Sequence, residues 1–481
     1  MHFSIPEIQE LKEPKGGTYT SYSVHINGTF HCSLRYRQFH ALHEQLKREF
    51  LTGLPSFPPK KVFPLSEPQK EERRLLLEKY LQLVATDPRI ASSIPFNGFL
   101  LAAQRETRAF EENQDVSLDV YLMHDHKVTL KGPVLLQSDQ VLEGVCAQLG
   151  VPDEFVYYFA LFLIQRHNND SYSIVRKLQD FESPYISQKA MSGSLKLVLR
   201  KCCWDPDIDS QLFSNQVTLN LLYIQTVTDV ERGWVQASQD TKRTLSRMQA
   251  RGAKLEYMDL ARSLKFYGYI HFLPCCCDYP STDTPVQVAI GMRELVIRLE
   301  DPSTGEIKEG NFKVTKMRCW RIMTLTNPRD DDDNKLELSF EYLINNQTLQ
   351  WVTIVSSQAI LMSICLQSIV EELLRKKSRI HVKKAGEKSC TIEYSYPKRD
   401  GSYHILPIRA GLHSKSCNKP TDSASVSNNK KNVSLSSLTG RQYSVKRLSE
   451  KFDVVNMRDT LAAEDVFIEN EAFVDIQDDE L

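Results

Sequence analysis

The sequence predicts an α+β protein built from several domains in series. Its 481 residues are enough for about three globular units of roughly 150 residues each. Hydrophobic residues make up 41% and charged residues 25%, so a wholly disordered, collagen-like or coiled-coil chain is excluded. Segments with the two-residue alternation of strands and segments with helical periodicity follow one another, and a last stretch rich in Ser and Asn differs from both.

The net charge excludes a class of partners but conceals an uneven distribution. It is -1, from 60 Lys and Arg against 61 Asp and Glu, which gives no positive field for nucleic acid. Residues 1–110 nevertheless hold 15 basic and 11 acidic residues, whereas residues 464–481 hold eight acidic residues and no basic one. We therefore expect a basic head and an acidic tail.

Neither export nor a metal centre is indicated. Glu7 and Glu10 interrupt the amino terminus where a secretory signal needs an apolar run, and the apolar run at 157–164 is too short to cross a bilayer. The 11 cysteines have no regular spacing, which favours reduced thiols in the cytoplasm over disulfides or a zinc site. No metal and no cofactor is predicted.

The first domain is expected over residues 1–110. Residues 18–34 are rich in Tyr, Thr and Val around Asn27-Gly28, which predicts a β-hairpin. A helix follows, with an apolar face of Phe39, Leu42 and Leu46. An extended loop is then predicted by five prolines, Pro55, Pro58, Pro59, Pro64 and Pro68. Two further helices are expected at 70–86 and 95–108.

Three further domains and a tail are expected. Residues 115–203 have the strand, strand, helix, strand order of a ubiquitin-like fold, with a helix capped by Ser138 and ended by Gly150. Residues 204–271 show only helical patterns. Residues 272–377 have short strands and one final helix, as in a pleckstrin-like or PTB-like sandwich. Residues 378–481 are expected to form a mostly disordered tail.

Three sequence elements of the first domain occur in the order of a known lipid-binding module. Arg35-Tyr36-Arg37-Gln38-Phe39, then Phe57-Pro58-Pro59-Lys60, then Arg73 resemble the phosphoinositide pocket of a PX (phox-homology) domain. The lobes that follow resemble the ubiquitin-like, helical and pleckstrin-like lobes of a FERM domain. A PX domain joined to such a module is similar to the PX-FERM subfamily of sorting nexins.

This resemblance implies a site for phosphatidylinositol 3-phosphate. Arg35 would bind the 3-phosphate bidentately, Tyr36 would stack under the inositol ring, Lys60 would meet the 1-phosphate, and Arg73 would take the 4- and 5-hydroxyls. The neighbouring residues expected at the membrane interface are Lys61, Val62 and Phe63.

Two alternatives remain open for these residues. An Arg-Tyr pair before a helix also fits a solvated charge beside a core tyrosine. Pro55 to Lys60 also matches the PxxP-x-cation pattern of ligands for Src-homology-3 domains.

The resemblance also implies a peptide site in the last lobe. A sandwich closed by a helix leaves a groove beside a sheet edge, where an extended peptide can add a strand. In related sorting nexins it takes Asn-Pro-x-Tyr or Asn-x-x-Tyr (NPxY or NxxY) segments of receptor tails, and the matching positions are Trp320, Val370 and Leu374. The alternative is that all three are core residues, because the helix has more apolar residues than one buried stripe needs.

The end of the chain, NEAFVDIQDDEL, resembles the terminus by which a member of this family engages the retriever recycling complex. The residues expected to dock are Phe473, Asp479, Glu480 and Leu481. A solubilising acidic tail is the alternative.

The resemblance implies a monomeric, non-enzymatic cargo adaptor, peripheral on early endosomes, that recycles receptors and protects them from lysosomal degradation. No GxxxxGK[ST], GxSxG or HExxH motif is present, and no catalytic residue is predicted. The alternative function is a scaffold that assembles Src-homology-3, cytoskeletal or small-GTPase partners at membranes.

Overall fold

The structure is a computed structural model. It describes residues 1–12, 16–61, 63–108, 115–167, 171–191, 193–300, 304–325, 335–345, 348–378, 382, 384–385, 390–410 and 467–473.

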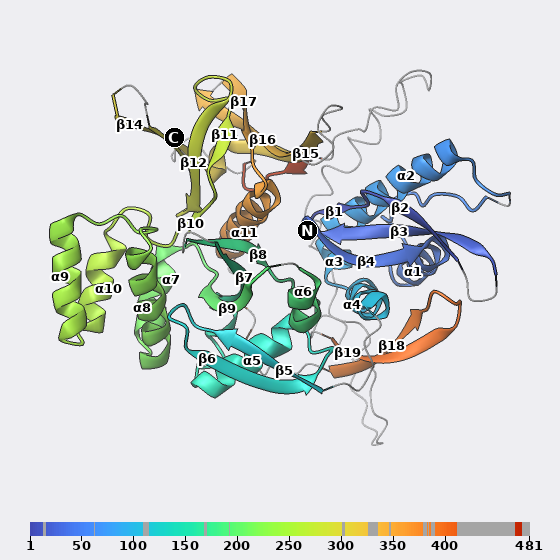
Figure 1. Cartoon of the computed structure of the whole chain (residues 1–481), viewed down its shortest axis with the longest axis horizontal. Helices are drawn as coiled ribbons and strands as arrows, with labels where there is room; N and C mark the ends of the chain where they lie inside the picture. Colours follow the sequence, from blue (N-terminus) through green and yellow to red (C-terminus); the bar gives the residue numbers. More distant parts are fainter. Residues whose placement is uncertain are drawn as a thin grey trace, which may run out of the picture. The chain divides into compact units, whose positions relative to one another are not determined.

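A small antiparallel sheet and four helices form the amino-terminal domain (Figure 1). The central strand β3 pairs with β1 and β2 along its length and with β4 through a tight turn. Asn27 and Gly28 have φ angles of 53° and 77° in that turn, which confirms the hairpin. The elements are β1 (Phe3–Ser4), β2 (Ile8–Lys12), β3 (Thr18–Ile26), β4 (Thr29–Arg35), α1 (Tyr36–Glu49), α2 (Glu67–Thr86), α3 (Pro88–Ala91) and α4 (Ile94–Arg108).

The predicted apolar face of α1 is confirmed. Phe39, Leu42 and Leu46 are fully buried in a core shared with α2, α4 and the sheet. The proline-rich residues between α1 and α2 form neither helix nor strand, as their lack of N–H donors requires. Pro55, Pro58, Pro59 and Pro64 therefore lie in an extended loop between two well-packed helices. The prediction is wrong for Pro68, which lies in the first turn of α2, where a proline has no intrahelical N–H bond to lose.

The second domain has the predicted ubiquitin-like order. Its sheet runs β6-β5-β9-β7-β8, with β5 and β9 parallel. The helix α5 begins one residue after its cap, which is Gln137 and not Ser138, and it ends at Gly150 in the left-handed conformation with a φ of 76°. The elements are β5 (Asp115–Tyr121), β6 (Lys127–Pro133), α5 (Ser138–Leu149), β7 (Phe159–Arg166), β8 (Tyr172–Lys177), α6 (Pro184–Ala190) and β9 (Leu195–Lys201).

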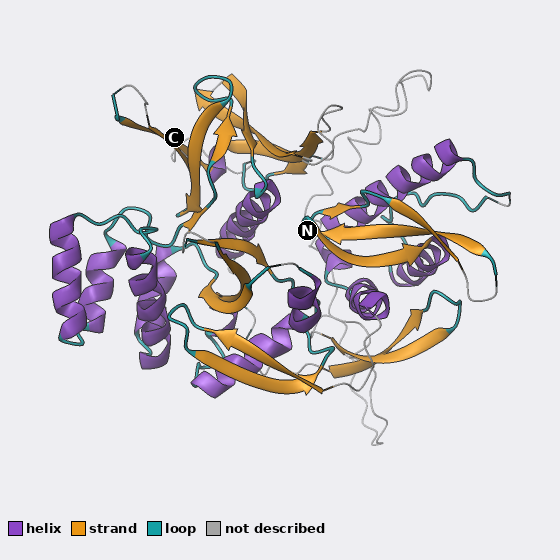
Figure 2. Ribbon diagram, in the orientation of Figure 1, coloured by secondary structure: helices purple, strands orange, loops and turns teal. Residues whose placement is uncertain are grey.

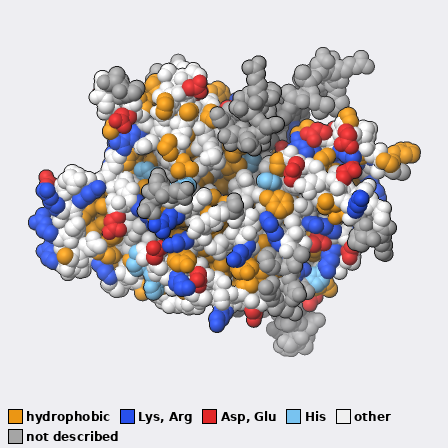
Figure 3. Space-filling model, in the orientation of Figure 1, with side chains coloured by type: hydrophobic (Ala, Val, Ile, Leu, Met, Phe, Trp, Pro, Cys, Tyr) orange, Lys and Arg blue, Asp and Glu red, His pale blue; other side chains and the backbone are white. Residues whose placement is uncertain are grey.

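The third domain consists of helices, which Figure 2 shows as a purple group. It is joined to the ubiquitin-like sheet by a buried ion pair, in which Arg200 donates to both carboxylate oxygens of Asp229 at 2.9 and 3.0 Å. Lys and Arg side chains line its outer end in Figure 3, where α9 exposes Arg243 and Arg247. The helices are α7 (Pro206–Phe213), α8 (Gln216–Glu231), α9 (Gln239–Ala250) and α10 (Lys254–Arg262).

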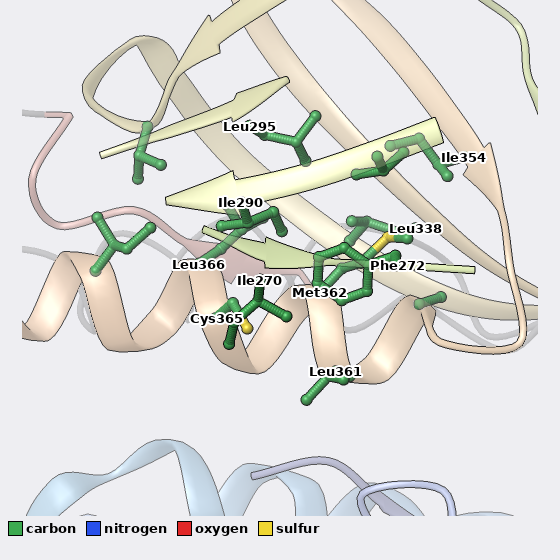
Figure 4. Packing of buried hydrophobic residues seen from close by; sticks show 14 of the residues in the cluster. Ile270, Phe272, Ile290, Leu295, Leu338, Ile354, Leu361, Met362, Cys365 and Leu366 are labelled. Carbon is green, nitrogen blue, oxygen red and sulfur yellow. The ribbon is translucent and has the colours of Figure 1, made fainter. Parts of the chain in front are cut away.

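The fourth domain is the predicted sandwich with a terminal helix. Its strands follow the order β14-β13-β12-β11-β17-β16-β15-β20, and β10 pairs with β12. Leu361, Met362, Cys365 and Leu366 of the helix α11 belong to the same core cluster as residues of the strands that it faces (Figure 4). The elements are β10 (Ile270–His271), β11 (Cys275–Cys277), β12 (Thr284–Gly291), β13 (Glu294–Glu300), β14 (Ile307–Lys313), β15 (Met317–Leu325), β16 (Lys335–Asn345), β17 (Thr348–Val355), α11 (Ala359–Lys377) and β20 (Ile468–Glu469).

The region after Lys377 contains structure that the sequence analysis did not expect. Strands β18 (Cys390–Pro397) and β19 (Tyr403–Ala410) form an antiparallel hairpin. The prediction of a mostly disordered tail is therefore wrong for these residues. The hairpin forms because its strands bury alternating apolar side chains, which are Tyr394, Tyr396, Leu406 and Ile408.

No helix among the described residues is both long and apolar enough to traverse a lipid bilayer.

Candidate functional sites

The first predicted site lies where β4 meets α1. The Arg35 guanidinium stacks over the ring of Tyr19 at 4.0 Å, and its Nη1 donates to the carbonyl oxygen of Arg399 at 3.2 Å. The backbone N–H of Arg35 donates to Oε1 of Gln38 at 3.0 Å. Both the main chain and the side chain of Arg35 are therefore held in place.

Tyr36 and Arg73 lie together at this site. The Arg73 guanidinium stacks over the Tyr36 ring at 4.3 Å. One of its nitrogens, Nη2, is buried and has no hydrogen-bond partner among the described residues. Leaving a charged donor unpaired is costly, so this nitrogen suits an added acceptor such as an inositol hydroxyl. Burial raises the pKa of Tyr36, so the ring stays neutral.

The proline-rich loop is anchored beside the same ring. The Tyr36 hydroxyl donates to the carbonyl oxygen of Pro58 at 2.7 Å. Phe57 stacks on His43 at 4.8 Å and meets Tyr80 edge-on at 5.0 Å. Burial lowers the pKa of His43, which keeps this aromatic cluster neutral.

The anchored loop presents cations and an apolar side chain outward. Lys60 and Lys61 are exposed, and Lys61 lies 3.6 Å from Glu72. Phe63 is 83% exposed. Val62 lies outside the described residues.

The second predicted site lies at the β15 edge of the sandwich, and a short segment of the chain's own tail already occupies it. Ile468 pairs with Trp320 and Glu469 with Cys319 as an antiparallel strand, β20. Asn470 follows and is 2% exposed. Its Nδ2 donates to the carbonyl oxygens of Val314 at 2.8 Å and Met317 at 2.7 Å.

Further contacts hold this tail segment, residues 467–473, on the sheet. The Asn470 N–H donates to the carbonyl of Arg318 at 3.0 Å, and the Phe467 ring lies 6.0 Å from the Trp351 ring. Ile468 and Ala472 pack against the core of the sandwich. Phe473 ends a turn that begins at Asn470. The segment therefore reads Asn-x-x-Phe, the spacing of an Asn-x-x-Tyr peptide.

The three predicted peptide-contact residues belong to, or pack against, the same core cluster but differ in access. Trp320 is 1% exposed, and its indole nitrogen donates to Ser363 Oγ of α11 at 3.0 Å. Val370 is buried, whereas Leu374 is half-buried beside the same core. In this arrangement the Trp320 side chain is a core residue and its backbone forms the edge. The assignment of the three residues to peptide binding stays a prediction.

Sequence reasoning missed two features that carry clear signals. The Asn470 to Phe473 spacing matches the motif expected for the partner, although the sequence analysis predicts only a docking role for the end of the chain. The hairpin β18–β19 has alternating apolar residues around Asp400-Gly401, which is a hairpin signal. The other docking residues, Asp479, Glu480 and Leu481, lie outside the described residues.

Family models match four successive parts of the chain. The PX domain matches residues 22–103, and the F1 lobe of the sorting nexin 17/27/31 FERM domain matches 116–204. The F2 lobe of the sorting nexin 17/31 FERM domain matches 205–265, and the sorting nexin 17 FERM C-terminal domain matches 268–374. The chain is thus a PX domain followed by three FERM lobes.

Whole-chain relatives agree. The chain is 45% identical to sorting nexin-17 of Danio rerio over 400 residues, covering 81% of this chain and 84% of the relative. Sorting nexin-17 of Homo sapiens is also 45% identical, covering 80% of this chain and 84% of the relative. Human sorting nexin-31 is 34% identical, covering 84% of this chain and 92% of the relative. The chain belongs to the PX-FERM sorting nexins, a family of non-enzymatic adaptors.

The family predicted from the sequence is therefore confirmed. Within it, short stretches such as MHFSIPE and SICLQS resemble both sorting nexin 17 and sorting nexin 31, and of the two sorting nexin 31 is the one we expect from the sequence. Overall identity is higher to the sorting nexin-17 relatives, at 45%, than to human sorting nexin-31, at 34%.

Proposed function

We propose that this sorting adaptor acts at early endosomes by binding two ligands at once. Its PX domain takes phosphatidylinositol 3-phosphate through Arg35, Tyr36, Lys60 and Arg73. Its third FERM lobe takes Asn-Pro-x-Tyr or Asn-x-x-Tyr segments of receptor tails and delivers them for recycling. Two modest contacts on one membrane give strong attachment, because the second contact forms at a high effective concentration.

One observation carries the peptide half of this proposal. The β15 edge and the adjoining carbonyls of Val314 and Met317 hold an Asn side chain followed three residues later by an aromatic ring. A receptor segment with Asn at this place would use the same acceptors, and strand addition would supply the main-chain hydrogen bonds. The tail segment and a receptor peptide would then exclude each other.

The lipid half rests on the chemistry around Tyr36. The Arg73 guanidinium stacks over the neutral Tyr36 ring, and the Arg35 guanidinium stacks over the Tyr19 ring. Arg73 keeps a buried N–H without an acceptor among the described residues. Arg is suited to bidentate contact with a phosphate, and the exposed Phe63 next to Lys60 and Lys61 suits the membrane interface. Membership in a sorting nexin family with a PX domain supports a peripheral place on endosomal membranes.

Vesicle co-sedimentation tests the lipid half. The native chain should bind vesicles containing phosphatidylinositol 3-phosphate, and Arg35→Ala should bind at least tenfold more weakly. Arg35→Lys should lose binding too, because an ammonium group cannot donate two parallel hydrogen bonds to one phosphate as a guanidinium does. Arg108→Ala removes the same charge from an exposed position of the domain and should bind like the native chain. Native binding by Arg35→Ala would refute the lipid assignment.

A competition experiment tests the peptide half. A synthetic peptide of residues 467–473 and a labelled receptor-type Asn-x-x-Tyr peptide should displace each other from the chain. Simultaneous binding of both peptides would show that they use different surfaces.

No observation favours the scaffold alternative. Pro58 is buried, and its carbonyl accepts the Tyr36 hydroxyl, so a Src-homology-3 domain would have to pull the loop from its anchor. Delivery to a retriever-type complex through the acidic terminus and the monomeric state remain part of the proposal.

A further inference from the structure

The hairpin β18–β19 packs on the PX domain as part of its core. Tyr396 is 1% exposed and its ring lies 5.7 Å from that of Phe99 on α4. A Cβ added at Gly98 would lie 2.4 Å from Cδ1 of Ile408, so a larger residue at this position would displace the Ile408 side chain. Hairpin and domain therefore form one hydrophobic unit, although the three FERM lobes separate them in sequence.

Polar groups of the hairpin reach the residue that fixes the Arg35 main chain. Gln38 is fully buried, and its Nε2 donates to the Tyr396 hydroxyl at 3.0 Å and to the Pro397 carbonyl at 3.1 Å. The Tyr396 hydroxyl donates in turn to Oε2 of Glu106 at 2.8 Å. Since Gln38 Oε1 accepts the N–H of Arg35, this network locks the start of α1.

The turn of the hairpin reaches the Arg35 side chain directly. Nη1 of Arg35 donates to the Arg399 carbonyl at 3.2 Å. The turn is itself fastened to the domain, because Arg399 Nη2 donates to the Ser33 carbonyl at 2.8 Å and to Thr107 Oγ1 at 2.7 Å. The Arg399 N–H also donates to Glu106 Oε1 at 2.9 Å.

The open end of the hairpin is attached to the first FERM lobe. Arg409 donates to both carboxylate oxygens of Glu143 on α5, at 2.6 and 2.9 Å. The hairpin is therefore held at both ends, at the lipid-site arginine and at the next domain.

We propose that the hairpin β18–β19 is a positioning element of the phosphoinositide site. Through the Arg399 carbonyl and the Gln38–Tyr396–Glu106 network, it sets the orientation in which Arg35 meets a 3-phosphate. The inference rests on the proposed lipid binding and assigns part of it to residues far outside the PX domain. A guanidinium binds a phosphate bidentately only when its N–H groups are aligned with the phosphate oxygens. Loosening the hairpin therefore lowers the affinity for the 3-phosphate, and the preference for it over other phosphate positions, without removing a residue that contacts the ligand.

Calorimetric titration of the full chain with soluble inositol 1,3-bisphosphate tests this. Tyr396→Phe removes the hydroxyl that contacts Gln38 and keeps the ring, and it should weaken binding about fivefold, as expected for one buried hydrogen bond. Tyr394→Phe is the matched control, because its hydroxyl donates to Gln45 at 2.7 Å, away from Arg35. It should bind within twofold of the native chain.

A second pair addresses the turn. Arg399→Ala releases the turn from Ser33 and Thr107 and should weaken binding about tenfold. Lys398→Ala removes the same charge from the adjacent residue and should have little effect. In the weakened variants the preference for inositol 1,3-bisphosphate over inositol 1,4-bisphosphate should fall, while the affinity for an Asn-x-x-Tyr peptide stays unchanged.

The outcomes separate this inference from the proposed function. If the native chain binds and all four variants bind like it, the hairpin has no positioning role and the lipid assignment stands. If Tyr394→Phe weakens binding as much as Tyr396→Phe, or the losses follow melting temperature, the role is only structural and the inference fails. If the native chain does not bind, both fail.

Discussion

Substitution of Asn470 by Ala should expose the peptide edge of the third FERM lobe. The side chain of Asn470 makes two hydrogen bonds across the interface, to the carbonyls of Val314 and Met317 at 2.8 and 2.7 Å. At about 0.5 to 1.5 kcal/mol each, their loss weakens the tail contact by roughly 1 to 3 kcal/mol, or about 5- to 150-fold. Because Asn470 is 2% exposed, no water replaces these bonds while the tail is bound.

The effect on a peptide follows from mutual exclusion. If the tail segment and the peptide compete, the apparent dissociation constant equals the intrinsic one divided by the fraction of chains with an open edge. Asn470→Ala raises that fraction, so the apparent affinity for a labelled Asn-x-x-Tyr peptide should increase, by no more than the factor lost from the tail contact.

Fluorescence anisotropy with native, Asn470→Ala and Glu471→Ala chains makes the measurement. Glu471 is exposed in the same turn, so Glu471→Ala should leave the affinity near native. Equal affinity for native and Asn470→Ala chains, or weaker binding by Asn470→Ala, would refute the competition.

Three further predictions concern other parts of the molecule. Asp229→Ala leaves the buried Arg200 unpaired, so it should lower the free energy of unfolding by about 3 to 5 kcal/mol in a denaturant titration; a loss below about 1 kcal/mol would contradict this. Burial lowers the pKa of His31 to about 4, so only the unfolded state takes up this proton as pH falls from about 6.5 to 4. The His31 proton should therefore lower the free energy of unfolding by about 2 to 3 kcal/mol between pH 7 and pH 4.5, so the drop over that interval should be smaller by this amount in His31→Gln; equal pH profiles would contradict this. Phe63→Ala should weaken vesicle binding several-fold without changing the affinity for soluble inositol 1,3-bisphosphate, and unchanged vesicle binding would exclude Phe63 from the membrane contact.

The fold class was predictable because local patterns determine most elements. The apolar spacing of Phe39, Leu42 and Leu46 required a helix with one buried face, and Asn27-Gly28 required a tight turn. These signals act over a few residues, so they survive without knowledge of the rest of the chain.

The contacts between distant segments were not predictable. Nothing near Arg35 in sequence indicates that the carbonyl of Arg399 lies beside its guanidinium. Likewise, the apolar excess on α11 indicated a partner, but not that Ile468 and Ala472 of the same chain cover this core. Such pairings depend on how the domains pack, and the spacing of apolar residues along the sequence carries no information about that packing.

Helix ends were less certain for a related reason. Ser138 is a strong capping residue, yet the backbone turns one residue earlier, where the Gln137 N–H donates to Gln140 Oε1 at 2.9 Å. The preference for a good capping residue is only about 1 kcal/mol, which the surrounding packing can outweigh.

Recruitment of a labelled Asn-x-x-Tyr peptide to vesicles tests the two-ligand account most directly. With phosphatidylinositol 3-phosphate in the vesicles, the native chain should carry the peptide to the membrane, and Asn470→Ala should carry more. Arg35→Ala should bind the peptide in solution but leave it there. Peptide recruitment by Arg35→Ala at the native level, or none by the native chain despite binding to each ligand alone, would contradict the account.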